Sequence, residues 1–157
     1  MEIGATKAVQ DRLKTTKIEE SKGTSLVFCW DTHLTKIKGR NVLFIVNASN
    51  RYTIVMTDIE PRNWNYYTMY IRSVIHGVMQ EMGYSEDQIG QYFKMSGDTT
   101  VTKTHGRKSV GGINRMVMDA QYFGKKLEKE AKYQWELSEY LNRDICQPEG
   151  FDAYGYP

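Results

Sequence analysis

The sequence has few of the residues that mark secreted or membrane proteins. Its 157 residues include only two cysteines and three prolines. Two cysteines are too few for a disulfide framework or for a zinc site built from cysteines. No apolar run approaches the roughly 18 residues of a membrane-spanning helix, and the N-terminus lacks the apolar stretch of a signal peptide. We therefore expect a cytoplasmic protein without a membrane partner.

The sequence also lacks a strong excess of either charge. Lysine and arginine number 21 against 19 acidic residues, which gives a formal net charge of +2. A dedicated nucleic-acid-binding protein usually has a larger basic excess, so this balance argues against nucleic acid as the main partner. Hydrophobic residues make up 40% and aromatic residues 12% of the chain, enough to build one core.

The apolar runs predict an α+β fold with an antiparallel sheet. Strands are expected at residues 1–3, 26–30, 34–38, 42–46, 52–56 and 99–104. The short connections favour hairpins, and hence a meander of about four to five strands packed against three to four helices. Residues 42–46 are uniformly apolar, which predicts a strand covered on both faces. The polar segment 15–24 is expected to be a loop.

Four helical segments are expected, all in a single domain over residues 1–146 that is followed by a flexible tail at 147–157. They run from Thr6 to Lys14, from Pro61 to the glycine at position 83, from Ser85 to Gly97, and from Gly106 onward. The last of these continues or bends near Gly124 and then reaches Leu141. Its apolar stripe needs cover, either from the sheet or from a second copy of the chain, so a homodimer is one expectation.

The segment Thr102–Arg115 carries the main functional hypothesis. It joins an expected strand to an expected helix, and the free amides at a helix N-terminus attract anions. Its side chains add hydroxyl, amide and cationic donors. The residues expected to bind an anion or a partner are Thr102, Lys103, Thr104, His105, Arg107, Lys108, Ser109, Asn114 and Arg115.

A simpler interpretation of the same segment stays open. Ser109 then only caps the helix, the glycines shape the turn, and the basic side chains are solvated. The segment lacks the spacing of a nucleotide-binding P-loop and has no neighbouring acid to hold magnesium. Both absences argue against a nucleotide hydrolase.

Two blocks of the sequence resemble a family of small bacterial proteins whose members also occur on plasmids and phages. The blocks are FCWDTHLTKIKGRNVLFIVNASNRYTIVM and TVTKTHGRKSVGGINRM. The family is catalogued as a domain of unknown function, so the resemblance implies a fold but no chemistry. In the first block Asp31-Thr32-His33-Leu34 stands where His-Ala-Asn-Leu is more usual. The resemblance implies an origin on a mobile element.

Other titratable residues offer weaker candidates. Strand pairing could bring His33 and His105 together with Asp31 or Asp98 into a metal or acid–base site, but the spacing does not require it. Cys29 lies in an apolar run and is expected to be buried. We expect no metal, no cofactor and no catalytic residue.

A second surface is rich in aromatic and basic residues. Exposed aromatic side chains beside arginines are typical of protein interfaces. The candidate interface residues are Arg51, Arg62, Trp64 and Tyr67.

These observations favour a non-enzymatic binding module with an anion-binding strand-to-helix junction. Its expected partner is a protein. In a more specific hypothesis, the chain is encoded on a mobile element and inhibits a host defence enzyme that targets nucleic acids. Two alternatives stay open. One is a small enzyme that acts on a phosphorylated substrate through the junction, and the other is a weak nucleic-acid-binding protein.

Overall fold

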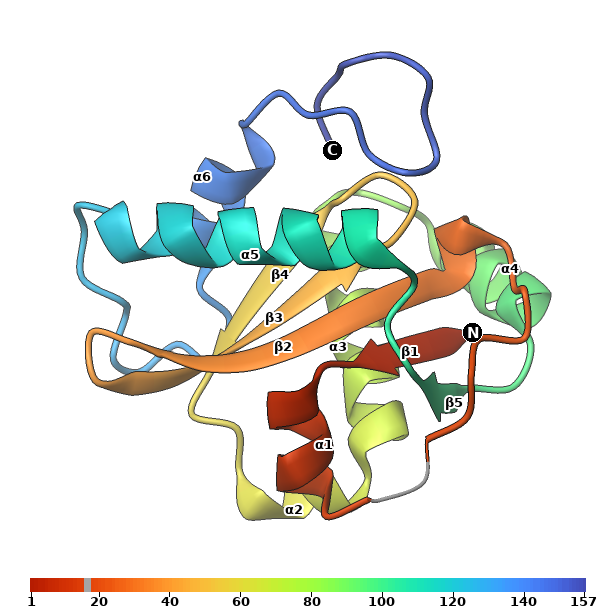
Figure 1. Cartoon of the computed structure of the whole chain (residues 1–157), viewed down its shortest axis with the longest axis horizontal. Coiled ribbons are helices and arrows are strands. Elements are labelled where there is room, and N and C mark those ends of the chain that lie inside the picture. Colours follow the sequence, from red (N-terminus) through yellow and green to blue (C-terminus); the bar gives the residue numbers. More distant parts are fainter. Residues whose placement is uncertain (16–17) are drawn as a thin grey trace.

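A computed structural model describes residues 1–15 and 18–157, so positions 16 and 17 of the expected loop lie outside the described residues. A five-stranded sheet runs through the middle of the molecule, with helices on both faces (Figure 1). Its strands lie in the order β4-β3-β2-β1-β5. They are β1 (Glu2–Ala5), β2 (Cys29–Ile37), β3 (Arg40–Asn47), β4 (Thr53–Thr57) and β5 (Thr100–Thr102).

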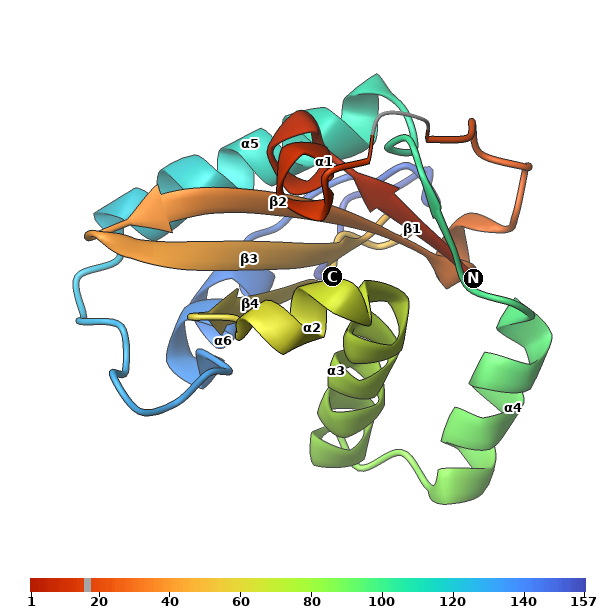
Figure 2. The same ribbon diagram turned by 90° about the horizontal axis from the view of Figure 1, so that it is seen from below.

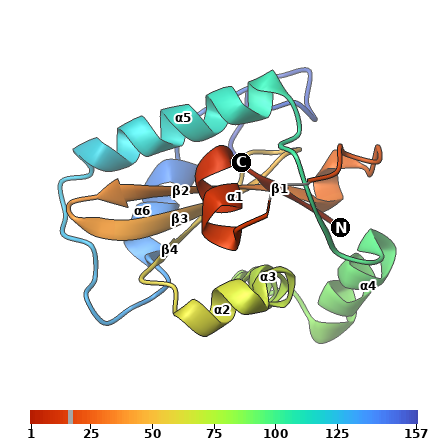
Figure 3. The ribbon, with the colours of Figure 1, turned by 60° about the horizontal axis from the view of Figure 1, so that its bottom comes forward.

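The helices form two groups on opposite faces of the sheet. Their bounds are α1 (Lys7–Leu13), α2 (Pro61–Asn65), α3 (Tyr67–Glu81), α4 (Glu86–Ser96), α5 (Arg107–Tyr122) and α6 (Trp135–Asn142), with a short 3-10 helix at Leu26–Phe28. Helix α5 lies on one side of the sheet, and α2, α3 and α4 lie on the other (Figures 2 and 3). Residues of α6 pack in the same hydrophobic core as those of α5.

The expectation of a purely antiparallel sheet is wrong. The hairpin strands β2, β3 and β4 pair antiparallel as expected, but β1 lies parallel to both β2 and β5. The N-terminal strand therefore joins the hairpins to the distant strand β5. The sheet is mixed because two of its strands arrive by crossover connections that contain helices, and such connections allow parallel pairing.

Three expected elements have different bounds in the structure. Residues 26–30 and 34–38 do not form two strands, because β2 continues unbroken from Cys29 to Ile37. The segment from Pro61 forms two helices, α2 and α3, separated by Tyr66. Helix α5 ends at Tyr122, and helical structure resumes only at Trp135. The described residues thus contain six α-helices, more than the three to four expected.

The sheet has a hydrophobic core on each face, which confirms that β3 is covered on both sides. Leu43 and Ile45 join the core under α1, α3 and α4. Val42, Phe44 and Val46 join the core under α5 and α6. Alternate side chains of a strand point to opposite faces, so a uniformly apolar strand is buried twice.

The segment before α6 covers the outer edge of β4. The C-terminal region, which was expected to pack either on the sheet or on a second copy of the chain, thus packs at least partly on the sheet. The backbone N–H of Thr57 donates to the carbonyl of Lys132 at 2.7 Å, and that of Gln134 donates to Val55 at 2.9 Å. Helix α6 then packs against the same strand. An edge strand exposes unpaired backbone groups, and these hydrogen bonds satisfy several of them.

Helix α4 has a side-chain cap, whereas Ser109 does not cap α5 but donates to Asp31. Ser85 caps α4 in a reciprocal pair with Gln88. Within the tail, the backbone N–H of Gly150 donates to the carbonyl of Ser49 at 3.0 Å. Cys146 and Gly155 form a short antiparallel bridge. No described helix combines the length and the apolar character needed to span a membrane.

Candidate functional site

Two neighbouring strands place four polar or small residues on the face of the sheet that α5 covers. In the parallel register, Glu2 lies beside Cys29 and Gly4 beside Asp31. The residues between them, Ile3 and Trp30, point to the opposite core. Because successive side chains alternate between faces, Glu2, Cys29 and Asp31 share the side that faces the start of α5. All three are buried.

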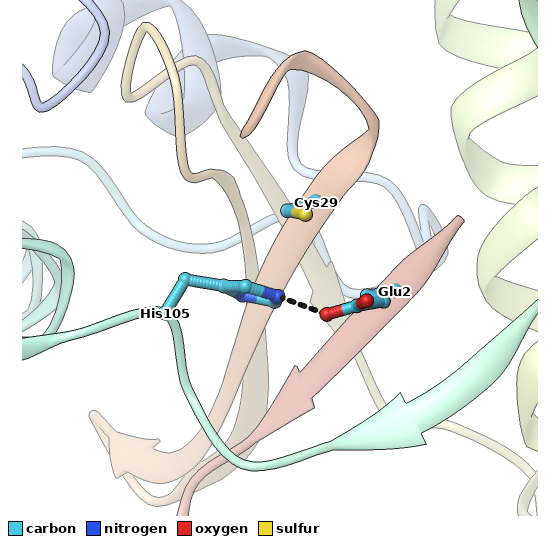
Figure 4. Close-up of side chains that lie close together, drawn as sticks. All are labelled: Glu2, Cys29 and His105. Carbon is cyan, nitrogen blue, oxygen red and sulfur yellow. Dashed lines mark hydrogen bonds and ion pairs between the residues drawn. The ribbon is translucent and has the colours of Figure 1, made fainter. Parts of the chain in front are cut away.

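His105 reaches this group from the loop between β5 and α5 (Figure 4). Its Nδ1 lies 2.7 Å from Asp31 Oδ1, and its Nε2 lies 3.1 Å from Glu2 Oε2. The imidazole is only 2% exposed. The backbone N–H of His105 and the hydroxyl of Ser109 also donate to the Asp31 carboxylate. One histidine thus bridges two buried carboxylates; we call Glu2, Cys29, Asp31 and His105 the buried cluster.

Hydrogen bonds and charge control the ionisation of the buried cluster. Burial lowers the pKa of His105, but hydrogen bonds and charge from Asp31 and Cys29 outweigh it and raise that pKa to about 10. Burial raises the pKa of Glu2, whereas donors such as Thr24 outweigh it and lower that pKa to about 2. At neutral pH His105 is therefore an imidazolium and Glu2 is ionised.

The cationic residues of the expected anion site do not converge. Lys103 pairs with Glu20, and Lys108 donates to the carbonyl of Pro148 at 3.2 Å. Arg115 pairs with Asp119 at 2.9 Å, on the surface of α5. Arg107 is exposed. Lys103, Lys108 and Arg115 thus point toward three different partners and do not form one cationic pocket.

The other residues of the expected anion site divide between the interior and the surface. Thr102 is fully buried within β5, Thr104 is half-buried, and Asn114 is exposed on α5. His105 and Ser109 do converge, but on the internal carboxylate of Asp31. A carboxylate of the chain itself thus occupies the region near the helix N-terminus that an external anion was expected to occupy.

Of the two histidines considered for a site with Asp31 or Asp98, only His105 contacts one of these carboxylates among the described contacts. His105 contacts Asp31, whereas His33 Nδ1 lies 3.1 Å from the hydroxyl of Thr6. Cys29 is buried as expected.

The four candidate interface residues do not form one surface. Tyr67 is buried, and its hydroxyl donates to Thr32 at 2.7 Å. Trp64 is half-buried and stacks on Tyr67, with ring centroids 5.5 Å apart. Arg62 is exposed beside Glu60, and Arg51 packs against Gly112.

An apolar pocket of about 650 Å³ lies on the opposite side of the sheet from the buried cluster. It is formed by the 3-10 helix, the β3–β4 turn, α3, α4 and the tail. Trp30 Nε1 donates to the hydroxyl of Tyr92 at 2.9 Å, and that hydroxyl donates to the carbonyl of Val27 at 2.8 Å, which fixes one wall. The apolar lining residues include Val27, Phe28, Trp30, Ile54, Ile75, Val78, Met79, Met82, Met95 and Phe151. Among the described lining residues, none has a side chain that is charged at neutral pH.

Residues 2–157 match a protein family described as a domain of unknown function, DUF6933. The chain belongs to this family. No curated protein and no solved structure matches the chain significantly. Membership in DUF6933 assigns no activity.

Two features escaped the sequence analysis. Glu2 and Cys29 belong to the buried cluster, but Glu2 lies in a short strand and Cys29 at the start of β2, and only the pairing of these two strands makes them neighbours. The apolar pocket combines five separate segments of the chain. The one available signal was the density of methionine and tyrosine between Met79 and Met95, which is typical of an adaptable binding surface.

Proposed function

We propose that this protein is a non-enzymatic binding module that recognises a protein partner through its apolar pocket. The observation that carries the proposal is the pocket itself. Its volume of about 650 Å³ lies within the range of about 300–1,000 Å³ that is usual for binding sites. Its lining combines apolar side chains with a few amides, including Asn47, Asn50 and Gln88. Such a lining favours uncharged apolar groups.

The surroundings of the pocket favour a protein over a small molecule. Large hydrophobic side chains at its edge are exposed, namely Val27, Met82, Tyr84, Met95 and Phe151. A ligand held inside the pocket would leave them in water, whereas a protein surface would cover them and gain from their burial. Methionine side chains are flexible and adapt to varied partners.

The chain's own tail illustrates the chemistry of the partner. Phe151 and Pro157 line the pocket, so an aromatic and a proline side chain of a peptide segment already lie against it. We infer that the partner presents apolar or aromatic side chains of the same kind.

The same lining argues against the two alternative functions. Phosphate groups are bound by lysine, arginine or clustered amides, and neither basic side chain occurs among the described residues of the pocket. His105, whose ionisation is strongly perturbed, is buried outside the pocket. A phosphorylated substrate and a nucleic acid are therefore both disfavoured as ligands.

In its narrower form, the proposal names the partner as a host defence enzyme that is inhibited by a mobile-element protein. This form is supported by the resemblance to plasmid and phage proteins and not by the pocket. An expected anion contact at Thr102–Arg115 is not needed for it.

Site-specific photocrosslinking in the host tests the proposal. A photoreactive residue is placed at Met82 or Met95, at the pocket, and at Met118, which is similarly exposed on α5. We expect one protein, identified by mass spectrometry, to crosslink to the two pocket positions and not to Met118. Equal crosslinking at Met118, or adducts with no protein at the pocket, would refute the proposal. A bound small molecule without a protein adduct would also refute it.

A further inference from the structure

We propose that Glu2, Cys29 and His105 form a binding site for a thiophilic divalent cation, with Zn²⁺ as the expected ion. This site is separate from the apolar pocket and does not depend on the function proposed for that pocket. It also differs from the sequence-based expectation of no metal. Carboxylate, thiolate and imidazole are all ligands that zinc uses in proteins.

The three side chains converge on one point (Figure 4). The Glu2 carboxylate, the Cys29 sulfur and a His105 ring nitrogen lie within 4.8 Å of one another. On a tetrahedral zinc ion, an oxygen and a nitrogen ligand are about 3.3 Å apart, and a sulfur and a nitrogen about 3.6 Å apart. The observed separation of 3.1 Å between Glu2 Oε2 and His105 Nε2 is close to the first value. The sulfur lies no more than 4.8 Å from the other two ligand atoms, so a shift on the order of 1 Å brings it to the tetrahedral spacing.

Surrounding residues orient two of the three ligands. Asp31 Oδ1 lies 2.7 Å from Nδ1 of His105. A protonated Nδ1 therefore donates to this carboxylate, and Nε2 faces Glu2. This arrangement matches the carboxylate–histidine–metal contact found around zinc sites. The hydroxyl of Thr24 and the backbone N–H of Lys22 both donate to Oε1 of Glu2, at 2.6 and 3.0 Å. The second oxygen, Oε2, remains directed at His105.

The buried cluster holds more carboxylates than side chains that can carry a positive charge. The side chains of Glu2 and Asp31 are 2% and 0% exposed. Among the described residues, His105 is the one basic side chain in hydrogen-bond or ion-pair contact with them. A divalent ion that replaces the protons of the Cys29 thiol and of His105 Nε2 leaves the net charge of the cluster unchanged, so the ion adds no unbalanced buried charge.

Metal binding exchanges protons for the ion. In the metal-free protein the Cys29 thiol lies 3.5 Å from the carbonyls of Thr24 and Ser25, to which it donates. Coordination forms bonds from the ion to Sγ, Nε2 and Oε2, and the protons of the thiol and of Nε2 pass to solvent. The fourth position of a tetrahedral ion remains open. The sulfur ligand selects zinc or cobalt over magnesium or calcium, which prefer oxygen.

Cobalt titration of the full chain tests the site. Reduced protein freed of metal by a chelator is titrated with Co²⁺, whose thiolate complexes absorb in the near ultraviolet and whose tetrahedral complexes absorb in the visible region. We expect both bands to saturate at one equivalent and to disappear when Zn²⁺ is added. Cys29→Ser should abolish the thiolate band. His105→Gln and Glu2→Gln should each weaken binding at least about tenfold.

The second buried cysteine supplies the control. Cys146→Ser should leave the Co²⁺ spectrum unchanged, and so should His33→Gln. If the wild-type protein shows no thiolate band, or if the band survives Cys29→Ser but not Cys146→Ser, the site is wrong.

A second measurement needs no variant and so remains valid if a substituted cluster fails to fold. Zn²⁺ should slow the alkylation of Cys29 in the wild-type protein without changing the alkylation of Cys146. Mass spectrometry measures the extent of alkylation at each cysteine. Equal alkylation of Cys29 with and without Zn²⁺ would overturn the proposal.

Discussion

Gly4 lies directly against the carboxylate of Asp31 on the neighbouring parallel strand. A Cβ atom added at Gly4 would collide with Asp31 Oδ1 and would come within 3.0 Å of the Thr104 Cα. The missing side chain therefore makes room for the Asp31–His105 contact. The buried cluster depends on a residue that contributes no functional group to it.

Replacing Gly4 with alanine should destabilise the protein by about 2 kcal/mol or more, because the added methyl group overpacks a site bounded by backbone. The carboxylate of Asp31 would be pushed from His105. Urea unfolding of Gly4→Ala measures the loss.

Gly111 provides the matched control. It lies in α5, and nothing lies within 4 Å of a Cβ built there. Gly111→Ala should stabilise the protein by up to about 1 kcal/mol, because alanine has the higher helix propensity. Equal changes in the free energy of unfolding for Gly4→Ala and Gly111→Ala would contradict the close packing of Gly4 against Asp31.

The hydroxyl of Tyr92 links two walls of the apolar pocket. Tyr92→Phe leaves Trp30 Nε1 without its acceptor and removes one of two donors to the Val27 carbonyl, which keeps its hydrogen bond from Asn47 Nδ2. We expect a loss of about 1–3 kcal/mol in the free energy of unfolding. Tyr122→Phe, at a highly exposed tyrosine, should change it by less than about 0.5 kcal/mol. Comparable losses in the two variants would argue against the bridging role.

Gln134 holds the segment that covers the edge of β4. Its side chain is buried, donates to the Thr57 hydroxyl at 3.1 Å, and accepts from the backbone N–H of Glu128 at 2.8 Å. Gln134→Ala should cost about 2–3 kcal/mol and expose the strand edge to pairing with other chains. Light scattering during urea unfolding should show aggregation for Gln134→Ala and none for the exposed helical variant Gln121→Ala. Equal light scattering from the Gln134→Ala and Gln121→Ala variants would contradict this role.

Burial lowers the pKa of His33. The folded protein therefore binds fewer protons at this residue than the unfolded chain does. The contribution of His33 is present above the unfolded pKa of about 6.5 and is lost as pH falls through that value toward the folded pKa. His33→Gln should remove this part of the pH dependence. Unfolding free energies of both proteins at about pH 7.5 and about pH 5 test it, and an identical change with pH in the two proteins would contradict it.

Local sequence patterns predicted the hairpin strands and most helix positions. Val42–Val46 is uniformly apolar, and the structure buries it on both faces within β3. The parallel pairing of β1 was missed, because its partners lie far along the chain and no local pattern records them. The segment before α6 has helical composition, yet its backbone bonds to β4, since tertiary hydrogen bonds outweigh helix propensity there.

The buried cluster was only partly accessible from the sequence. Pairing of His105 with Asp31 could be raised as an alternative from their positions near strand ends. Glu2 could not be added, because a glutamate in a short N-terminal strand is normally solvated and its burial depends on the register with β2. The basic residues of the junction suggested an anion site; in the structure Lys103 pairs with Glu20 and Arg115 with Asp119.

Methyl NMR of the full chain labelled at its methionines tests the central claim, recognition through the apolar pocket, most directly. The protein that crosslinks at the pocket is added in increasing amounts. We expect the methyl signals of Met79, Met82 and Met95 to shift, and those of Met116 and Met118, on the opposite side of the sheet, to stay in place. Shifts confined to Met116 and Met118 would contradict the account.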